Sequence, residues 1–210
     1  MSVDPVPHAS TPDEAEALHD RSLRLMARIG QGDHHAFREL VELHQSAVVG
    51  TCARMLGDLD EAEDVAQQVF LRVWKAAPRY EPTARFTTWL FTITKNLVFN
   101  ETRRRSRRPT VSLDAPRLGD PAGDRTSRDL PDAAARPADV AALQAELEEA
   151  INRAIAALPD HQRLAVTLRR YEDLPYEDIA EVLGTTVSAV KSLLFRARTQ
   201  LRDHLNQYLE

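Results

Sequence analysis

Apolar residues recur at three- and four-residue spacing along most of the chain, which is the periodicity of amphipathic helices. Between residues 22 and 108 this pattern predicts three well-marked helices, at about 34–56, 60–76 and 87–105. Asp33 is placed to cap the first helix, because a carboxylate accepts hydrogen bonds from the free N–H groups of a helix start. Gly57 and Pro78 are placed to end the first and second helices.

A second helical pattern begins near Val140 and continues to the end of the chain. Within it, residues 174–205 predict a helix of about two turns, a turn opened by Gly184, and a longer helix that begins near Ser188, which can cap it. Two short amphipathic helices joined by a glycine-containing turn are typical of a helix-turn-helix.

Two stretches lack helical periodicity. Residues 1–20 contain three prolines and five acidic groups, and predict a flexible arm. Residues 109–139 contain five prolines, two glycines, six aspartates and four arginines, and predict an acidic, flexible linker. The sequence therefore predicts an all-α protein whose two small helical domains, 21–108 and 140–210, are joined by a flexible linker.

Composition limits the functions to be considered. A net charge of −5 argues against indiscriminate nucleic-acid binding, although an average hides local basic patches. Cys52 is the only cysteine of the chain and falls on the apolar stripe of its helix, so we expect a buried thiol and no internal disulfide. The first residues lack the features of a signal peptide, and no apolar run approaches about 18 residues. We therefore expect a soluble intracellular protein without membrane insertion.

The last predicted helix has an apolar and a basic face. Val190, Leu194 and Ala197 form the start of the apolar stripe. The opposite side carries Ser188, Lys191, Ser192, Phe195, Arg196, Arg198 and Arg202. The second helix of a helix-turn-helix lies in the DNA major groove, so the basic face predicts DNA binding. An αα-hairpin with a solvated basic face is the alternative.

Residues 85–108 carry seven basic residues and a single acid, Glu101. Five arginines at the end of this segment would repel one another without an anionic partner, and phosphates are the obvious one. Amides such as Asn96 and neighbouring aromatic residues add the hydrogen bonding and stacking that single-stranded nucleic acid requires. The alternative is an aromatic core with a solvated basic tail, and we prefer that interpretation for Trp89 and Phe91.

Residues 60–75 predict a helix with a polar face opposite Val65, Val69 and Trp74. The polar face carries Glu61, Asp64, Gln67, Gln68 and Arg72. Such a face suits docking against the helices of another protein, and an ordinary solvated face is the alternative.

Together these segments resemble the extracytoplasmic-function (ECF, group IV) RNA polymerase sigma factors, which belong to the sigma-70 family. The runs GDHHAF, AEDVAQQVFLRVW and FTTWLFTITKNLVFNETRRRSRRP resemble the region 2 domain of that family. The run ALPDHQRLAVTLRRYEDLPYEDIAEVLGTTVSAVKSLLFRARTQL resembles its region 4 domain. The resemblance implies an alternative sigma factor that binds core polymerase and directs initiation at promoters with −10 and −35 elements, assisting DNA melting.

The resemblance also implies roles for individual residues. It implies that Asp64, Gln67 and Gln68 bind the polymerase, with Phe70 and Trp74 packing beneath them. The −10 element falls to Lys95, Asn96, Asn100, Arg103, Arg104 and Arg105, with Asn96 placed to bind a base flipped out of the strand. The −35 element falls to Ser188, Lys191, Ser192, Phe195 and Arg196.

The implied partners are the clamp helices of the largest polymerase subunit, the flap of the second-largest subunit, promoter DNA and an anti-sigma factor. We expect a monomer when the protein is free, a cytoplasmic location, no cofactor and no catalytic residue.

Two other functions fit the sequence less well. A conventional helix-turn-helix regulator would bind duplex DNA as a dimer, but it would leave the segment 85–108 unexplained. A small helical metalloenzyme would require metal-ligand spacing, which His34, His35, His44 and His161 do not have. We therefore expect no metal site and no enzyme.

Overall fold

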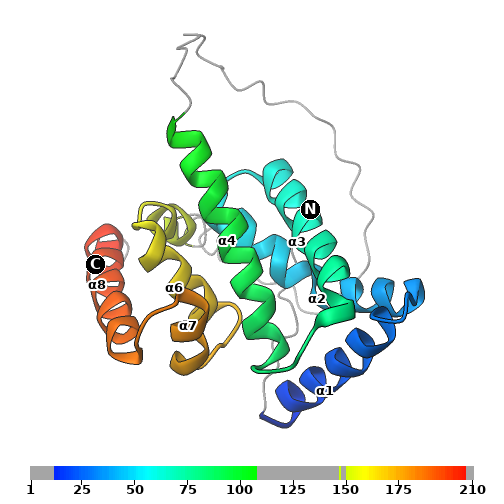
Figure 1. Cartoon of the computed structure of the whole chain (residues 1–210). Coiled ribbons are helices and arrows are strands. Elements are labelled where there is room, and N and C mark those ends of the chain that lie inside the picture. The colour runs from blue at the N-terminus through cyan, green and yellow to red at the C-terminus, as the bar shows by residue number, and fades with distance from the viewer. Residues whose placement is uncertain (1–11, 108–146, 148–149, 207–210) are drawn as a thin grey trace, which may run out of the picture.

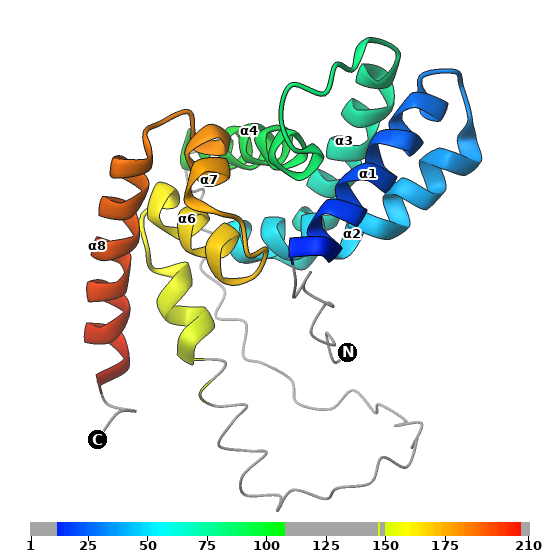
Figure 2. The same ribbon diagram turned by 90° about the horizontal axis from the view of Figure 1, so that it is seen from below.

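The computed structural model describes residues 12–107, 147 and 150–206, and the elements in these ranges are helices. Figures 1 and 2 show helices α1–α4 at one side of the molecule and helices α6–α8 at the other, with α7 beside α4. The helices are α1 (Pro12–Ile29), α2 (His34–Leu56), α3 (Leu59–Ala76), the short 3-10 helix η1 (Ala77–Arg79), α4 (Phe86–Arg107), α6 (Asp160–Arg170), α7 (Tyr176–Leu183) and α8 (Val187–Leu205). The predicted all-α class is confirmed. The predicted linker, 109–139, lies outside the described residues.

The predicted ends of α2 are confirmed in detail. The Asp33 side chain accepts hydrogen bonds from the backbone N–H groups of His35 and Ala36, at 2.9 and 3.0 Å. The Ala36 hydrogen bond, together with Arg28, lowers the pKa of Asp33 below its usual range. Gly57 follows the helix with φ 73°, a left-handed conformation that glycine adopts without strain.

Two predicted boundaries were wrong. The flexible arm was expected to reach residue 20, but α1 begins at Pro12, a residue type that suits a helix start, and acidic residues fill its first turn. His19 then accepts a hydrogen bond from the backbone N–H of Phe86 at 3.1 Å, which anchors α1 to the start of α4. The cap of α8 is Thr186 and not Ser188, since its hydroxyl accepts from the N–H of Ala189 at 3.2 Å.

The core of the first four helices is apolar, with one buried imidazole. Phe86, Met26 and Leu40 are fully buried there. His44 bonds to the Ser22 hydroxyl at 2.9 Å, and burial lowers the pKa of this histidine to about 4, so its ring is neutral at pH 7. Cys52 is buried as expected, and burial raises the pKa of its thiol to about 12.

The two predicted domains pack against each other, which the sequence did not indicate. Helix α2 contacts α6, α4 contacts α7, and buried residues of both parts form one hydrophobic cluster. At this junction the Arg54 guanidinium lies over the Tyr171 ring at 3.6 Å. Phe99 also meets the ring of His161, with centroids 5.0 Å apart. The two units are therefore in contact in a closed arrangement.

Arg163 of α6 makes a further contact across this junction. Its guanidinium donates to the Met55 carbonyl at 2.7 Å and to the Leu158 carbonyl at 2.9 Å. The Met55 carbonyl belongs to the last turn of α2, where carbonyls have no partner within their own helix.

Replacing Arg163 by methionine is therefore expected to lower the free energy of unfolding by about 2–3 kcal/mol, because two charge-assisted hydrogen bonds are lost and two carbonyls are left unpaired. Urea denaturation followed by circular dichroism measures this loss. Arg170→Met, at an exposed position of the same helix, is the matched control and should change stability little. Equal losses in the two variants would contradict the assigned role.

Candidate nucleic-acid interface

Helix α8 presents the predicted basic face to solvent. Val190, Leu194 and Ala197 are buried against the other helices, as their spacing predicted. The five predicted −35 residues are all exposed on the outer side: Ser188, Lys191, Ser192, Phe195 and Arg196. Phe195 is 69% exposed, which is unusual for a phenylalanine and leaves its ring free to contact an apolar group of a ligand.

The turn before α8 has the geometry of a helix-turn-helix. Gly184 ends α7 with φ 67° and ψ 42°, and its N–H bonds back to the last turn of that helix. The N–H of Thr185 bonds to the carbonyl of Ala180 at 2.9 Å. This compact turn, in which Gly184 is left-handed, sets α8 at an angle to α7 (Figure 2). Because Val190, Leu194 and Ala197 are buried, the basic face of α8 points outward.

Helix α4 carries the predicted amides on an accessible face. Asn96 and Asn100 are exposed, whereas Leu97, Val98 and Phe99 between them are buried. Lys95 is half-buried, and burial lowers the pKa of its ammonium group. The exposed amides lie one turn apart, so a single extended strand can meet both.

The arginines at the end of α4 do not all remain free for phosphates. Arg105 donates to the Leu56 carbonyl at 2.7 Å and is paired with the Glu61 carboxylate, so it ties α4 to α2 and α3. Arg104 is paired with Glu101 at 2.7 Å on the surface, and such an exposed pair exchanges easily for a phosphate. Arg103 is exposed. Carboxylates of the chain itself therefore balance two arginines of this run, so the run does not by itself require an anionic ligand.

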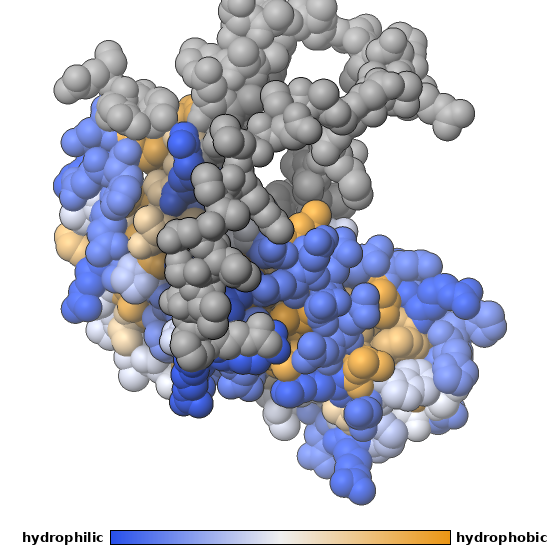
Figure 3. Space-filling view, turned by 90° about the horizontal axis from the view of Figure 1, so that it is seen from above, coloured by the Kyte–Doolittle hydropathy of each residue, from blue (hydrophilic) through white to orange (hydrophobic). Residues whose placement is uncertain are grey.

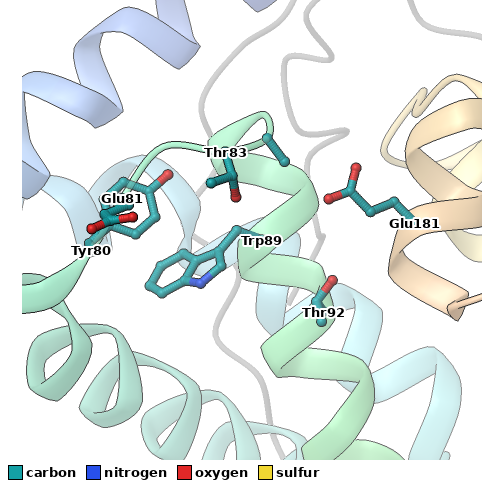
Figure 4. A pocket seen from close by; sticks show the side chains of 7 residues that line it. Tyr80, Glu81, Thr83, Trp89, Thr92 and Glu181 are labelled. Atoms are coloured by element: carbon teal, nitrogen blue, oxygen red, sulfur yellow. The ribbon is translucent and has the colours of Figure 1, made fainter.

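A pocket of about 160 Å³ lies beside the start of α4, and sequence reasoning missed it. It is lined by the loop residues Tyr80, Glu81, Thr83 and Ala84, by Trp89 and Thr92 of α4, and by Glu181 of α7. Figure 4 shows Glu181 extending from α7 on the opposite side of the pocket from Tyr80 and Trp89. The sequence feature that could have indicated this pocket is Tyr80, which lies between Pro78 and Pro82 and ahead of Trp89. Trp89, predicted to be core, is only half-buried: its ring packs on Tyr80 at 4.6 Å between centroids and lines the pocket.

Helix α3 presents the predicted docking face. Asp64, Gln67 and Gln68 are exposed, whereas Val65, Val69, Phe70 and Val73 are buried on the other side. Trp74 is half-buried and stacks on His34 with ring centroids 4.7 Å apart, in agreement with the packing role expected for it. The face also includes Leu71, which is 55% exposed and which the sequence analysis did not single out.

The residues described, 12–107, 147 and 150–206, offer neither a metal cluster nor a membrane span. No group of three or more His, Cys, Asp or Glu residues is placed there to hold a metal ion. No helix in those ranges is long and apolar enough to cross a membrane. On the face shown in Figure 3, hydrophilic residues predominate, and the hydrophobic ones form small separate areas.

The chain is similar to known proteins over most of its length. Residues 40–108 match the family model of sigma-70 region 2, and residues 148–201 match that of sigma-70 region 4. The chain is 34% identical to the RNA polymerase sigma-H factor of Pseudomonas aeruginosa, in an alignment that covers 90% of this chain and 96% of that protein. It is 33% identical to the ECF RNA polymerase sigma factor SigW of Bacillus subtilis, with 85% and 93% covered.

The chain belongs to the ECF RNA polymerase sigma factors. It therefore acts as an alternative sigma factor in transcription initiation, and it binds core RNA polymerase and promoter DNA. The alternative of a conventional helix-turn-helix regulator fails, because such a regulator has no counterpart of region 2.

The fold of this sigma factor agrees with that of solved relatives. The structure of CnrH in complex with the cytosolic domain of CnrY matches it with a TM-score of 0.63 at 25% sequence identity, over 90% of this chain and 99% of that chain. Region 2 of the sigma factor includes α3 and α4, and region 4 includes α6, α7 and most of α8.

Proposed function

We propose that this sigma factor divides promoter recognition among three helix faces. Helix α3 docks on the clamp helices of the largest polymerase subunit through Asp64, Gln67 and Gln68. Helix α4 captures the −10 element as a single strand, and helix α8 binds the −35 element as duplex. The second domain also contacts the flap of the second-largest polymerase subunit.

For the −10 element, Asn96 would bind a flipped base, since an amide offers a donor and an acceptor side by side. Asn100 and Lys95 lie next to it along the helix. Arg103 and Arg104 would hold the neighbouring phosphates. Arg105 is left out of this group because Leu56 and Glu61 already occupy its guanidinium.

The −35 assignment rests on the exposed face of α8, and the exposure of Phe195 is the observation that carries it. A large apolar ring is held in solvent among basic and hydroxyl groups, which suits contact with a thymine methyl group. Lys191 and Arg196 are placed for guanine edges or phosphates, and Ser188 and Ser192 add hydroxyl groups.

The proposed sigma factor has no catalytic activity of its own, needs no cofactor and is a monomer when free. Because it would act on RNA polymerase, we propose that the protein is located in the cytoplasm. We further propose an anti-sigma factor as a partner, by analogy with CnrH, whose solved structure holds the cytosolic domain of CnrY.

Run-off transcription with bacterial core polymerase, followed by promoter selection from a random library, tests the proposal. Sequence-dependent transcripts that require the added chain are expected. Purified chain that neither associates with core polymerase nor starts any transcript would overturn the proposed function.

Lys191→Ala and Arg196→Ala should each lower transcription from the selected promoters, because each removes a contact to DNA. The expected loss of promoter-binding free energy is about 1–3 kcal/mol. Loss of discrimination against a scrambled −35 sequence would identify a base contact. Arg170→Ala, exposed on α6, is the control and should leave transcription unchanged. Variants that transcribe from these promoters as well as the parent would contradict the assignment.

A further inference from the structure

The pocket beside the start of α4 has a chemistry that the proposed promoter contacts do not use. Its walls come from the loop 80–84, from α4 and from α7 (Figure 4). A single water needs about 10–15 Å³ of such space, so a pocket of about 160 Å³ takes a ligand of several non-hydrogen atoms. Glu81, Thr83 and Glu181 are exposed, so the pocket is open to solvent. A small solute can therefore reach it.

Two aromatic rings form one side of the pocket. The rings of Tyr80 and Trp89 lie 4.6 Å apart between centroids and are inclined at 58°, so they form a corner and not a flat stack. Both side chains are half-buried, and both line the pocket. The face of an aromatic ring carries partial negative charge and attracts cations, and tryptophan attracts them most strongly. This side of the pocket thus favours a cation with an apolar body.

Two carboxylates complete the pocket. Glu81 follows Tyr80 in the loop, and Glu181 extends from α7 on the opposite side (Figure 4). Among the residues that the structure describes, no basic side chain forms an ion pair with either glutamate. The arginines that flank the loop, Arg79 and Arg85, are not part of the lining. The pocket therefore carries two negative charges and no positive one.

The hydrogen-bonding groups of the pocket are mainly acceptors. The Thr92 hydroxyl donates its proton to the Thr88 carbonyl at 2.9 Å, so it can only accept a hydrogen bond from a ligand. Ionised carboxylates such as those of Glu81 and Glu181 also only accept. An ammonium group has three donors and no acceptor, which matches this lining. A phosphate or a carboxylate would instead be repelled.

From these observations we propose that this pocket binds a small alkylammonium ion. The ammonium group donates to the carboxylates of Glu81 and Glu181, and the alkyl chain packs on the rings of Tyr80 and Trp89. An ion held in this way contacts both helical units, since Glu181 belongs to α7 and the other residues belong to α4 and its preceding loop. The site lies outside the proposed polymerase and promoter contacts, so the inference goes beyond the proposed function.

The fluorescence of Trp89 tests this site directly. The chain has two tryptophans, and Trp74→Phe leaves Trp89 as the only one; Trp74 does not line the pocket. The full chain with this substitution is titrated with butylammonium chloride at pH 7, and potassium chloride keeps the ionic strength constant. A saturable change in emission is expected. Two weak ion pairs and one cation–π contact place half-saturation on the order of 1 mM.

Three solutes check that charge and size both matter. The neutral isostere 1-butanol should cause no saturable change over the same range, and potassium chloride alone should cause none. An equal response to either would overturn the proposal. Tighter binding of Nα-acetyl-lysine methylamide than of butylammonium would assign the site to a lysine side chain of a partner protein, which contradicts a small free ligand.

Variants of the two glutamates identify the residues that bind. Glu81→Gln and Glu181→Gln should each raise the half-saturation concentration about two- to fivefold, the effect typical of an exposed ion pair. Glu42→Gln removes the same charge at an exposed position of α2 and is the matched control, so it should bind like the parent. Equal affinities in all three variants would refute the assigned site, and circular dichroism checks that their helices are intact. The titration contains neither DNA nor polymerase, so its failure would leave the proposed function standing.

Discussion

Asn96→Ala is expected to reduce open-complex formation sharply while leaving polymerase binding intact. The amide is exposed on α4, and it is proposed to bind one edge of a flipped base through its donor and its acceptor. A bidentate contact to a base is worth about 1–3 kcal/mol, which corresponds to roughly a 5- to 150-fold loss. The reactivity of unpaired thymines toward permanganate measures promoter melting, and a gel-shift assay with core polymerase measures docking.

The matched control for this variant is Gln45→Ala, which removes another exposed amide, on α2. It should affect neither melting nor docking. Promoter melting by Asn96→Ala at the parent rate would refute the role of Asn96. Equal loss of melting and of docking would instead indicate a damaged domain.

The helices and their ends could be predicted from the sequence because their causes are local. Asp33 and Gly57 act on backbone groups within a few residues of themselves, so their types and positions suffice. The exposed faces of α3 and α8 follow in the same way from helical periodicity. The start of α1 was missed because its anchor, the bond from Phe86 to His19, joins residues 67 positions apart.

The closed arrangement could not be predicted for the same reason. Thr51 and Glu172 are 121 positions apart, and Arg163 and Met55 are 108 apart. Each of these side chains is ordinary for its own helix, and only the three-dimensional packing brings it to a partner. The role of Arg105 was likewise hidden, because an arginine in a basic run looks the same whether it binds phosphate or the Leu56 carbonyl.

The exposed leucine Leu71 is expected to be an anchor of polymerase binding. It lies on the same side of α3 as the proposed docking residues, since Asp64 precedes it by two turns and Gln67 by one. If Leu71 lies at the centre of the docking interface, a charge there must be desolvated on binding, and disruption of a hot-spot position costs about 2 kcal/mol or more. Leu71→Glu should therefore weaken the affinity for core polymerase by about 30-fold or more. Fluorescence anisotropy of the labelled sigma factor against core polymerase measures the change.

Leu59→Glu provides a control on the same helix. Leu59 is 56% exposed and Leu71 is 55% exposed, so the two substitutions place the same charge at equally accessible sites. At 3.6 residues per turn, Leu71 lies about 20° from Asp64 around the helix axis, whereas Leu59 lies about 120° from Leu71. If α3 docks through the face of Asp64 and Gln67, Leu71→Glu weakens binding and Leu59→Glu has little effect. Equal losses would show that any charge on this helix disturbs docking, and a larger loss for Leu59→Glu would move the interface to the neighbouring side of α3.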